Sequence, residues 1–321
     1  MTFNTCDLSQ YRILVTGAGG FIGSELTKWL LEQGALVVGN DTVWSKTAVC
    51  LEQKRWLKVD GGFAEKIDEI DRCLFSADRD KTGVIHLAGM ANASDCEQIP
   101  YAAFNQNVHL TVKVLEYCRK RDIDKIVYPS TGYVYGDQLT HPANEEDSAH
   151  PSGFYTITKL SAEAMIQGYL RLFNMVGVIA RLSNVYGAES NIGTVAGLIM
   201  GQVNMQKEIS VQSFTPVRDF IFIKDAVEGL GRLLKQVEIP GCHIVNLSTG
   251  IGTSVLELAE TICDASGYSR ERIKQLEGTG NSAYSRLVLD NGKLGYLTGW
   301  TPKYNLRDGM LTIMKGSNKD A

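Results

Sequence analysis

The run Arg12-Ile-Leu-Val-Thr16, followed at once by Gly17-Ala-Gly-Gly-Phe-Ile-Gly23, decides the fold of this 321-residue chain. The first five residues form a short apolar, β-rich run, which predicts a buried strand. After the glycines, apolar residues recur at helical spacing until Gly34, so we expect a helix that ends at this glycine. Leu36-Val-Val-Gly39 then predicts a second strand. The predicted order is strand, glycine turn, helix, strand.

The glycine turn has the spacing of a phosphate-binding loop. Gly17, Gly20 and Gly23 form G-x-x-G-x-x-G between the predicted strand and helix. The first glycine allows a tight turn, the middle one lets a pyrophosphate approach the backbone, and the last lets the helix pack closely on the strand. Such a phosphate lies at the helix N-terminus, where N–H groups and the helix dipole point at it. The alternative is a tight turn with no ligand.

An acidic residue, Asp41, stands at the end of the second predicted strand. A carboxylate at this place can accept both hydroxyl groups of an adenosine ribose, and it would repel a 2′-phosphate. The sequence therefore predicts a dinucleotide site that takes NAD in preference to NADP.

The alternation of strands and helices continues along the chain. Further strands are predicted at 83–88, 125–128 and 176–182, and helices at 101–119 and 156–173. Alternation of this kind is typical of a parallel sheet with helices on both faces. We expect an α/β fold with a Rossmann-type, doubly wound parallel sheet and a smaller C-terminal α/β substrate domain.

The strand–helix pattern loosens after Asn184, where glycines cluster. We therefore expect two domains. The first is an NAD-binding Rossmann domain over 1–184, with segments near 218–247 returning to it. The second is a substrate-binding domain made from 185–217 and 248–321.

Composition excludes several classes of protein. Hydrophobic residues make up 44% and charged residues 21%, as in ordinary globular proteins, and not as in disordered chains. Thirty-two Lys and Arg against 36 Asp and Glu give a net charge of −4, so no global attraction to nucleic acid or anionic membranes is expected. No apolar run of about 20 residues predicts a membrane span, and the polar residues 1–10 do not form a secretory signal.

Cysteine and histidine show no metal-binding pattern. The seven cysteines are scattered without C-x-x-C spacing, and the five histidines form no H-E-x-x-H pair. We expect no metal site and no disulfide framework, and reduced thiols favour a cytoplasmic location.

Tyr155 and Lys159 form a candidate catalytic pair. They are four residues apart and share one face of a predicted helix. To act as a base near neutrality, a phenol must have its pKa lowered from near 10 to about 7. A neighbouring ammonium and a nicotinamide cation both act in that direction. The alternative is an ordinary helix surface, but the glycine turn upstream favours catalysis.

Ser130 and Thr131 follow the predicted strand at 125–128. They would therefore stand at the carboxyl end of the sheet, where open α/β folds bind ligands. A hydroxyl there can hydrogen-bond a substrate oxygen while Tyr155 moves the proton. The alternative is ordinary turn chemistry.

Ordered motifs connect these features over nearly the whole chain. They are Thr16-Gly-Ala-Gly-Gly-Phe-Ile-Gly23, Asp41, His86-Leu-Ala-Gly89, Asn107-Val108, Ser130-Thr131, Val134-Tyr-Gly136, Tyr155 with Lys159, Arg181-Leu-Ser-Asn-Val-Tyr-Gly187 and Arg218-Asp-Phe-Ile221. In these motifs the chain resembles the extended short-chain dehydrogenase/reductases, specifically the NAD-dependent nucleotide-sugar epimerases and dehydratases.

The resemblance implies residue roles on the cofactor side. Tyr155 would be the acid/base, and Lys159 would hold the nicotinamide ribose and lower the pKa of Tyr155. Ser183 would lie near the nicotinamide. The other residues implied to bind NAD are Gly17, Gly20, Phe21, Ile22, Gly23, Asp41, Asp60, Leu87, Ala88, Gly89 and Asn107.

The resemblance also implies roles on the substrate side. Thr131 matches the active-site hydroxyl of the family, and Asn184 would lie near the substrate diphosphate. Arg218 matches an arginine that binds the nucleotide phosphates, which suits a guanidinium. The alternative for Arg218 is a structural ion pair with Asp219 or Asp225.

Two segments depart from the family pattern. Where many members carry a second phosphate-binding arginine in Arg-Pro-Gly-Asp, this chain has Gly278-Thr-Gly-Asn-Ser-Ala-Tyr-Ser-Arg286, so Arg286 would have to replace it from another register. Gly132 and Tyr133 stand where 4,6-dehydratases place an acid that protonates the departing hydroxyl, which disfavours that reaction.

The resemblance therefore predicts an NAD-dependent nucleotide-sugar epimerase that acts at C4 through a transient 4-keto sugar. The alternatives are a nucleotide-sugar 4-ketoreductase or dehydrogenase, a dehydratase, and a cofactor-sensing protein without catalysis. The sequence leaves the sugar and the nucleotide open. The resemblance also implies a homodimer formed through the helices at 101–119 and 156–173.

Overall fold

A seven-stranded parallel sheet forms the centre of the computed structural model, which describes residues 6–45, 55–75, 81–123, 125–137, 141–190, 192–276 and 285–317. Its strand order is β10-β6-β5-β4-β1-β2-β3. The strands are β1 Tyr11–Thr16, β2 Leu36–Asp41, β3 Trp56–Asp60, β4 Lys81–His86, β5 Lys125–Thr131, β6 Val176–Leu182 and β10 Gly241–Leu247. The order reverses between β1 and β4, and such switch points open a crevice at the carboxyl ends of the strands.

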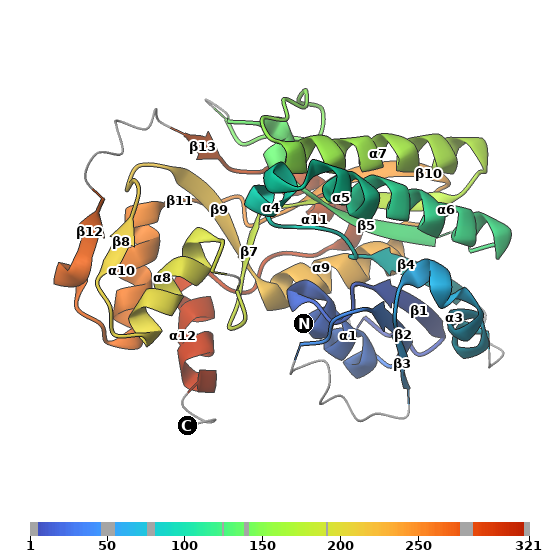
Figure 1. Ribbon diagram of the computed structural model, residues 1–321, viewed down its shortest axis with the longest axis horizontal. Helices are drawn as coiled ribbons and strands as arrows, with labels where there is room; N and C mark the ends of the chain where they lie inside the picture. Colours follow the sequence, from blue (N-terminus) through green and yellow to red (C-terminus); the bar gives the residue numbers. More distant parts are fainter. Residues whose placement is uncertain are drawn as a thin grey trace.

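Helices cover both faces of this sheet, as Figure 1 shows. One face packs against α1 (Phe21–Glu32) and α9 (Ile223–Gln236), and the other against α3 (Ile67–Leu74), α6 (Leu110–Lys120) and α7 (Phe154–Leu172). Successive residues of β1 pack on opposite faces of the sheet: Ile13 and Val15 lie in the hydrophobic core on one face, and Leu14 lies in the core on the other. The predicted doubly wound fold is confirmed.

The helix predicted at 101–119 is divided in the structure. It consists of α5 (Pro100–Phe104), one π-helical stretch at Asn105–His109, and α6, and it is preceded by the short helix α4 (Ala93–Gln98). Wide turns of this kind often mark functional sites. Here the turn contains Asn107, a predicted cofactor residue.

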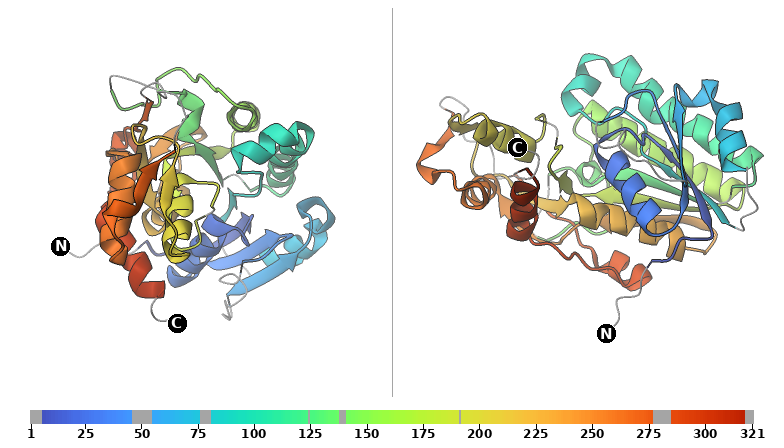
Figure 2. Two further views of the ribbon diagram at one scale, coloured as in Figure 1. Left: turned by 60° about the vertical axis from the view of Figure 1, so that its left-hand side comes forward. Right: turned by 90° about the horizontal axis from the view of Figure 1, so that it is seen from below.

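A second group of elements lies beside the large sheet, at the left of Figure 1 and in the right view of Figure 2. Its helices are α8 (Val195–Asn204), α10 (Val255–Ser266) and α12 (Leu306–Ser317). A small sheet centres on β9 (Val217–Phe222), which pairs with β7 (Asn184–Tyr186), β11 (Gly252–Ser254) and β13 (Arg286–Leu287). A two-stranded sheet pairs β8 (Ile209–Val211) with β12 (Ile273–Gln275).

Two expectations about the strands need correction. Within 218–247, β10 is a strand of the large sheet and α9 packs against that sheet. The strand β9 lies in the small sheet, so 218–222 does not return to the first domain's sheet. The strand β3 was not predicted at all. Its sequence contains the exposed charges of Lys58 and Asp60, because it lies at the edge of the sheet and not in its buried centre.

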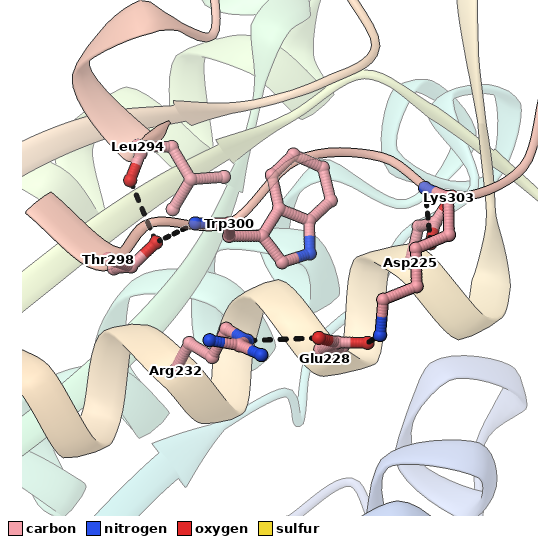
Figure 3. A network of polar contacts seen from close by, with 7 residues as sticks. All are labelled: Asp225, Glu228, Arg232, Leu294, Thr298, Trp300 and Lys303. Carbon is pink, nitrogen blue, oxygen red and sulfur yellow. Dashed lines mark hydrogen bonds and ion pairs between the residues drawn. The ribbon is translucent and has the colours of Figure 1, made fainter. Parts of the chain in front are cut away.

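The C-terminal segment is tied to α9 through the network in Figure 3. The carboxylate of Asp225 accepts hydrogen bonds from the backbone N–H groups of Lys303 and Tyr304, at 3.0 to 3.1 Å. Glu228 accepts from Arg232 at 2.9 Å and from the Lys303 ammonium at 2.5 Å. This segment connects α11 (Gly292–Thr298), which packs against α9, to α12 in the second group of elements.

Candidate functional site

The glycine turn lies at the switch point of the large sheet, between β1 and α1. Gly17 has a φ of +74°, and a Cβ on it would lie 2.6 Å from the backbone nitrogen of Ala88. A Cβ on Gly23 would lie 2.0 Å from the carbonyl oxygen of Gly17. Gly20 differs, because its Cβ would meet only that same carbonyl, at 3.5 Å. Two glycines therefore permit close packing within the chain, and the third leaves the backbone open to a ligand.

The N-terminus of α1 can accept an anion. Its N-cap residue, Gly20, provides no side-chain hydrogen bond, and the first turn contains no acidic residue. The N–H groups of this turn and the positive end of the helix dipole are thus left for a group that approaches Gly20 from outside. Gly19, which the sequence reading did not single out, is also needed, since its Cβ would lie 2.0 Å from the Val43 carbonyl oxygen. The turn fits the pyrophosphate of a dinucleotide.

Asp41 lies at the end of β2, and its carboxylate already binds the backbone. It accepts hydrogen bonds from the N–H groups of Gly19 at 2.9 Å, Thr42 at 2.7 Å and Val43 at 3.2 Å. Asp41 therefore fixes the glycine turn in addition to any contact with a ribose. Its register partner on β3, Asp60, is exposed and forms an ion pair with Lys58 at 3.2 Å.

Leu87, Ala88 and Gly89 follow β4 and face the glycine turn across the switch point. Asn107 holds this loop from inside. Its amide accepts from the N–H of Met90 at 2.7 Å and donates to the Met90 carbonyl at 3.0 Å and to Thr158 at 2.9 Å. Because Asn107 is buried and these bonds engage both ends of its amide, it positions the loop and α7. Its predicted contact with the cofactor stays a prediction.

His86, at the end of β4, is fully buried between two hydroxyls. Its ring nitrogens lie 2.6 Å from Thr16 Oγ1 and 3.1 Å from Thr111 Oγ1. Burial, together with the charge of Lys159, lowers the pKa of His86 to about 3. The histidine is therefore neutral in the folded protein at every pH above this value.

This neutral histidine predicts a loss of stability in acid. Unfolded histidine titrates near pH 6.5, so between about pH 6.5 and 3 the unfolded chain binds a proton that the folded protein rejects. The free energy of unfolding then falls as the pH falls, by about 2 kcal/mol between pH 7 and pH 5 from this group alone. Urea unfolding at pH 7 and pH 5 should show that the free energy of unfolding falls less in His86→Gln than in the wild-type protein. An equal loss in both proteins would contradict this account.

Tyr155 and Thr131 come together at the crevice. Tyr155 lies in the first turn of α7 and Thr131 at the end of β5, and the two side chains are close enough for the Thr131 hydroxyl to lower the pKa of the phenol. Burial raises the pKa of Tyr155 to about 12, and the Thr131 hydroxyl opposes the rise only in part. The protein alone thus keeps this phenol protonated. The predicted lowering of its pKa by Lys159 is not found.

The position of Lys159 explains this difference. Its ammonium donates to the carbonyl oxygen of Pro129 at 2.8 Å and lies 4.2 Å from the centre of the Tyr128 ring. Burial lowers the pKa of Lys159 to about 8, although Glu163 opposes the fall. Lys159 is therefore still mostly charged near neutrality, but its ammonium contacts Pro129 and Tyr128, and burial has the largest effect on the pKa of Tyr155.

Ser130 does not share the site with Thr131. Neighbouring strand residues point to opposite faces, and the Ser130 hydroxyl donates to the buried carboxylate of Glu163 at 2.5 Å. The prediction that Ser130 is a catalytic hydroxyl is therefore wrong in its geometry. Its hydrogen bond is made inside the protein, away from the crevice.

Ser183 and Asn184 lie where β6 ends and β7 begins. Asn184 donates to the Asp219 carbonyl oxygen at 3.2 Å and accepts from the phenol of Tyr133 at 2.9 Å. Tyr133 thereby joins the site from the turn after Thr131, and it also lies near Tyr155, whose pKa it helps to raise. The sequence reading noted Tyr133 only as a departure from the dehydratase pattern.

Arg218 lies on β9, at the second group of elements. Its guanidinium donates to Ser285 Oγ at 2.6 Å and to two backbone carbonyls, and it lies 3.6 Å from the Asp137 carboxylate. The predicted alternative partners are engaged elsewhere, Asp219 by Thr249 and Gly250, and Asp225 by the segment at 303–304. Arg286 pairs with Val217 in the same sheet. Residues 278–284 of the departing segment lie outside the described residues.

An uncapped helix N-terminus at a switch point, with the half-buried Tyr155 and the buried Thr131 beside it, defines an α/β enzyme that binds a dinucleotide. Residues 13–248 match the model of the NAD dependent epimerase/dehydratase family. The chain belongs to this family, as the sequence motifs predicted, and its cofactor is NAD. Among the residues that the structure describes, no helix is long and apolar enough to pass through a bilayer.

Individual relatives carry out several sugar-nucleotide reactions. The chain is 32% identical to a Methanocaldococcus jannaschii protein called "Putative UDP-glucose 4-epimerase", over 96% of this chain and 99% of that protein. It is 31% identical to UDP-glucuronic acid decarboxylase 5 of Arabidopsis thaliana, over 94% and 88%. The Thermotoga maritima UDP-glucose 4-epimerase, solved with UDP-glucose, superimposes with a TM-score of 0.83 at 25% identity, over 96% and 99%.

Proposed function

We propose that this protein is an NAD-dependent nucleotide-sugar epimerase that inverts the configuration at C4 through a transient 4-keto sugar. The observation that carries the proposal is the half-buried phenol of Tyr155, which lies beside the Thr131 hydroxyl at the crevice next to the glycine turn. The epimerases among the relatives support the same reaction.

The chain's own residues would hold NAD along the switch point. The backbone of Gly17, Gly20 and Gly23 receives the pyrophosphate, and Asp41 receives the adenosine ribose. Lys159 holds the nicotinamide ribose. The walls of the cleft come from residues on the neighbouring strand ends, namely Phe21, Ile22, Asp60, Leu87, Ala88, Gly89 and Ser183. When bound, NAD supplies a hydride acceptor and donor and a positive charge that favours the phenolate form of Tyr155.

Tyr155 moves the proton of the reaction. Its phenolate takes the proton of the C4 hydroxyl as C4 becomes a ketone, and the phenol returns a proton when the alcohol re-forms with the opposite configuration. Thr131, which lies beside the phenol, holds the substrate oxygen in place during both steps. Lys159 keeps a positive charge near the pair, because its pKa of about 8 leaves it mostly protonated near neutrality.

The substrate diphosphate would lie between the two groups of elements. Asn184 and Arg218 approach this region from β7 and β9, and a guanidinium suits phosphate oxygens. Tyr133, and not a carboxylic acid, stands two residues after Thr131, so the site lacks the usual acid for expelling water. This arrangement favours epimerisation over dehydration.

The test is a product assay with the NAD-loaded protein and a panel of UDP- and dTDP-hexoses. We expect a C4 epimer to appear until both sugars reach equilibrium, without net change in absorbance at the reduced-nicotinamide band. Stoichiometric NADH would instead identify a dehydrogenase, and carbon dioxide from a uronic acid substrate a decarboxylase. Binding of NAD without any turnover would identify a cofactor sensor.

We also propose a division of labour between the two groups of elements. Residues 1–184, with α9 and β10, bind NAD, and residues 185–217 and 248–321 bind the substrate. The six described cysteines form no disulfide, which suits the reducing cytoplasm.

A homodimer through α5, α6 and α7 completes the proposal. These helices leave large apolar side chains exposed, including Tyr101, Met165 and Leu172. A second copy could cover them in a four-helix bundle. Sedimentation at micromolar concentration should show a dimer, and a monomer alone would contradict it.

A further inference from the structure

A buried carboxylate lies directly beneath the candidate catalytic pair. Glu163 is on α7, one turn after Lys159, and its side chain is 0% exposed. It accepts a hydrogen bond from Ser130 at 2.5 Å and two from Arg181, at 2.8 and 3.3 Å. Arg181 itself is only 5% exposed. The carboxylate and its two partners therefore form a network closed to solvent.

Each partner of Glu163 lies next to a strand end that faces the crevice. Ser130 immediately precedes Thr131 on β5, and Arg181 lies two residues before Ser183 on β6. Glu163 thus connects α7, the helix that carries Tyr155 and Lys159, to β5 and β6, the strands that end at or next to Thr131 and Ser183.

The network extends one strand further. The Arg181 guanidinium lies 4.7 Å from the centre of the Tyr135 ring, and the Tyr135 phenol donates to Asn246 on β10 at 2.8 Å. Although burial opposes it, the hydrogen bond that Arg181 donates to Glu163 raises the pKa of the guanidinium, so Arg181 remains charged. Well-packed apolar residues can often replace a buried ion pair without loss of stability, so stability alone does not account for this one.

We propose that Glu163 is a positioning residue that sets the distance between the Tyr155–Lys159 helix and the strand ends carrying Thr131 and Ser183. The role in turnover rests on the proposed epimerase activity. The geometry of the network is independent of the sugar and of the nucleotide.

The carboxylate also acts on Lys159 through charge. Glu163 raises the pKa of Lys159 against the effect of burial. The other titratable groups near Lys159 come from three elements and are Cys96 on α4, His86 on β4 and Tyr128 on β5. Removing Glu163 would leave the cation of Arg181 unpaired nearby, so both changes favour loss of the Lys159 proton.

The test compares Glu163→Gln with Glu228→Gln in the full-length, NAD-loaded protein. Glu228, shown in Figure 3, is the matched control, because it also pairs with cations, the half-buried Arg232 and the exposed Lys303, but lies on α9 away from the crevice. For Glu163→Gln we expect kcat to fall about tenfold with KM within twofold. We expect the alkaline limb of the kcat profile to move about half a pH unit downward. Glu228→Gln should lower the melting temperature alone.

A second measurement separates this inference from the proposed function. Carbon-13 NMR of labelled lysine, with the Lys159 signal assigned from Lys159→Met, reports its titration without turnover. A lower midpoint in Glu163→Gln supports the proposal even if no sugar is epimerised. The proposal is overturned if the Lys159 midpoint is unchanged in Glu163→Gln and kcat of this variant changes no more than that of Glu228→Gln. If Glu163→Gln does not fold, Ser130→Ala decides: a threefold or larger fall in kcat supports the proposal, and wild-type kcat refutes it.

Discussion

Replacing Tyr155 by phenylalanine lowers kcat about a thousandfold while NAD remains bound. The substitution removes one oxygen from a half-buried ring in the first turn of α7, so the fold and the glycine turn are unaffected. What is lost is the phenol beside Thr131 that would exchange a proton with the C4 hydroxyl. The loss therefore falls on kcat and not on the affinity for the cofactor.

The matched control is Tyr296→Phe. Tyr296 lies on α11 and is 90% exposed, so the same chemical change should leave kcat at the wild-type value. Initial rates and NAD titrations of the three proteins check both statements. Turnover of Tyr155→Phe within threefold of wild type would remove Tyr155 from the mechanism.

Gly23→Ala should disrupt both folding and NAD binding. Its Cβ would lie 2.0 Å from the Gly17 carbonyl oxygen and 2.8 Å from the Ala18 Cα. Both atoms belong to the backbone, so no side chain can move aside, and α1 must shift away from β1. We expect a loss of about 3 kcal/mol or more in the free energy of unfolding, and NAD affinity at least about a hundredfold weaker.

Gly20→Ala separates packing from binding. Gly20 has φ −76° and ψ 177°, which alanine adopts freely, and its Cβ would meet nothing closer than 3.5 Å. Stability should change by no more than about 1 kcal/mol, while the methyl group weakens NAD binding about tenfold where the pyrophosphate approaches. Urea unfolding and NAD titration of both variants provide the measurement. Wild-type NAD affinity in Gly20→Ala would contradict a pyrophosphate at this turn.

The large sheet could be predicted from sequence because parallel strands buried on both faces read as continuous apolar runs. Ile13, Leu14 and Val15 face two different cores, and each run of this kind marks one strand. The edge strand β3 is half exposed and carries charged residues, so its sequence lacks the continuous apolar run that predicts a strand. The helix at 101–119 reads as continuous because a single wide turn leaves the apolar pattern intact.

The site could be predicted only where its residues are close in sequence. Tyr155 and Lys159 share a helix turn, and Thr131 ends a recognisable strand. The sequence does not indicate the pairing of Glu163 with Arg181, because charged residues are rarely buried and only their mutual contact permits it. The contact of Asp137 with Ser285 joins residues 148 positions apart, which no local pattern records.

The measurement that tests the central claim most directly is a crystal structure of this chain with NAD and a nucleotide sugar that it epimerises. The account predicts the Tyr155 oxygen at about 3 Å from the sugar C4 oxygen, with Thr131 bonded to the same oxygen. It also predicts the pyrophosphate against Gly20. A Tyr155 ring directed away from the sugar, or a dinucleotide bound elsewhere than at the glycine turn, would contradict it.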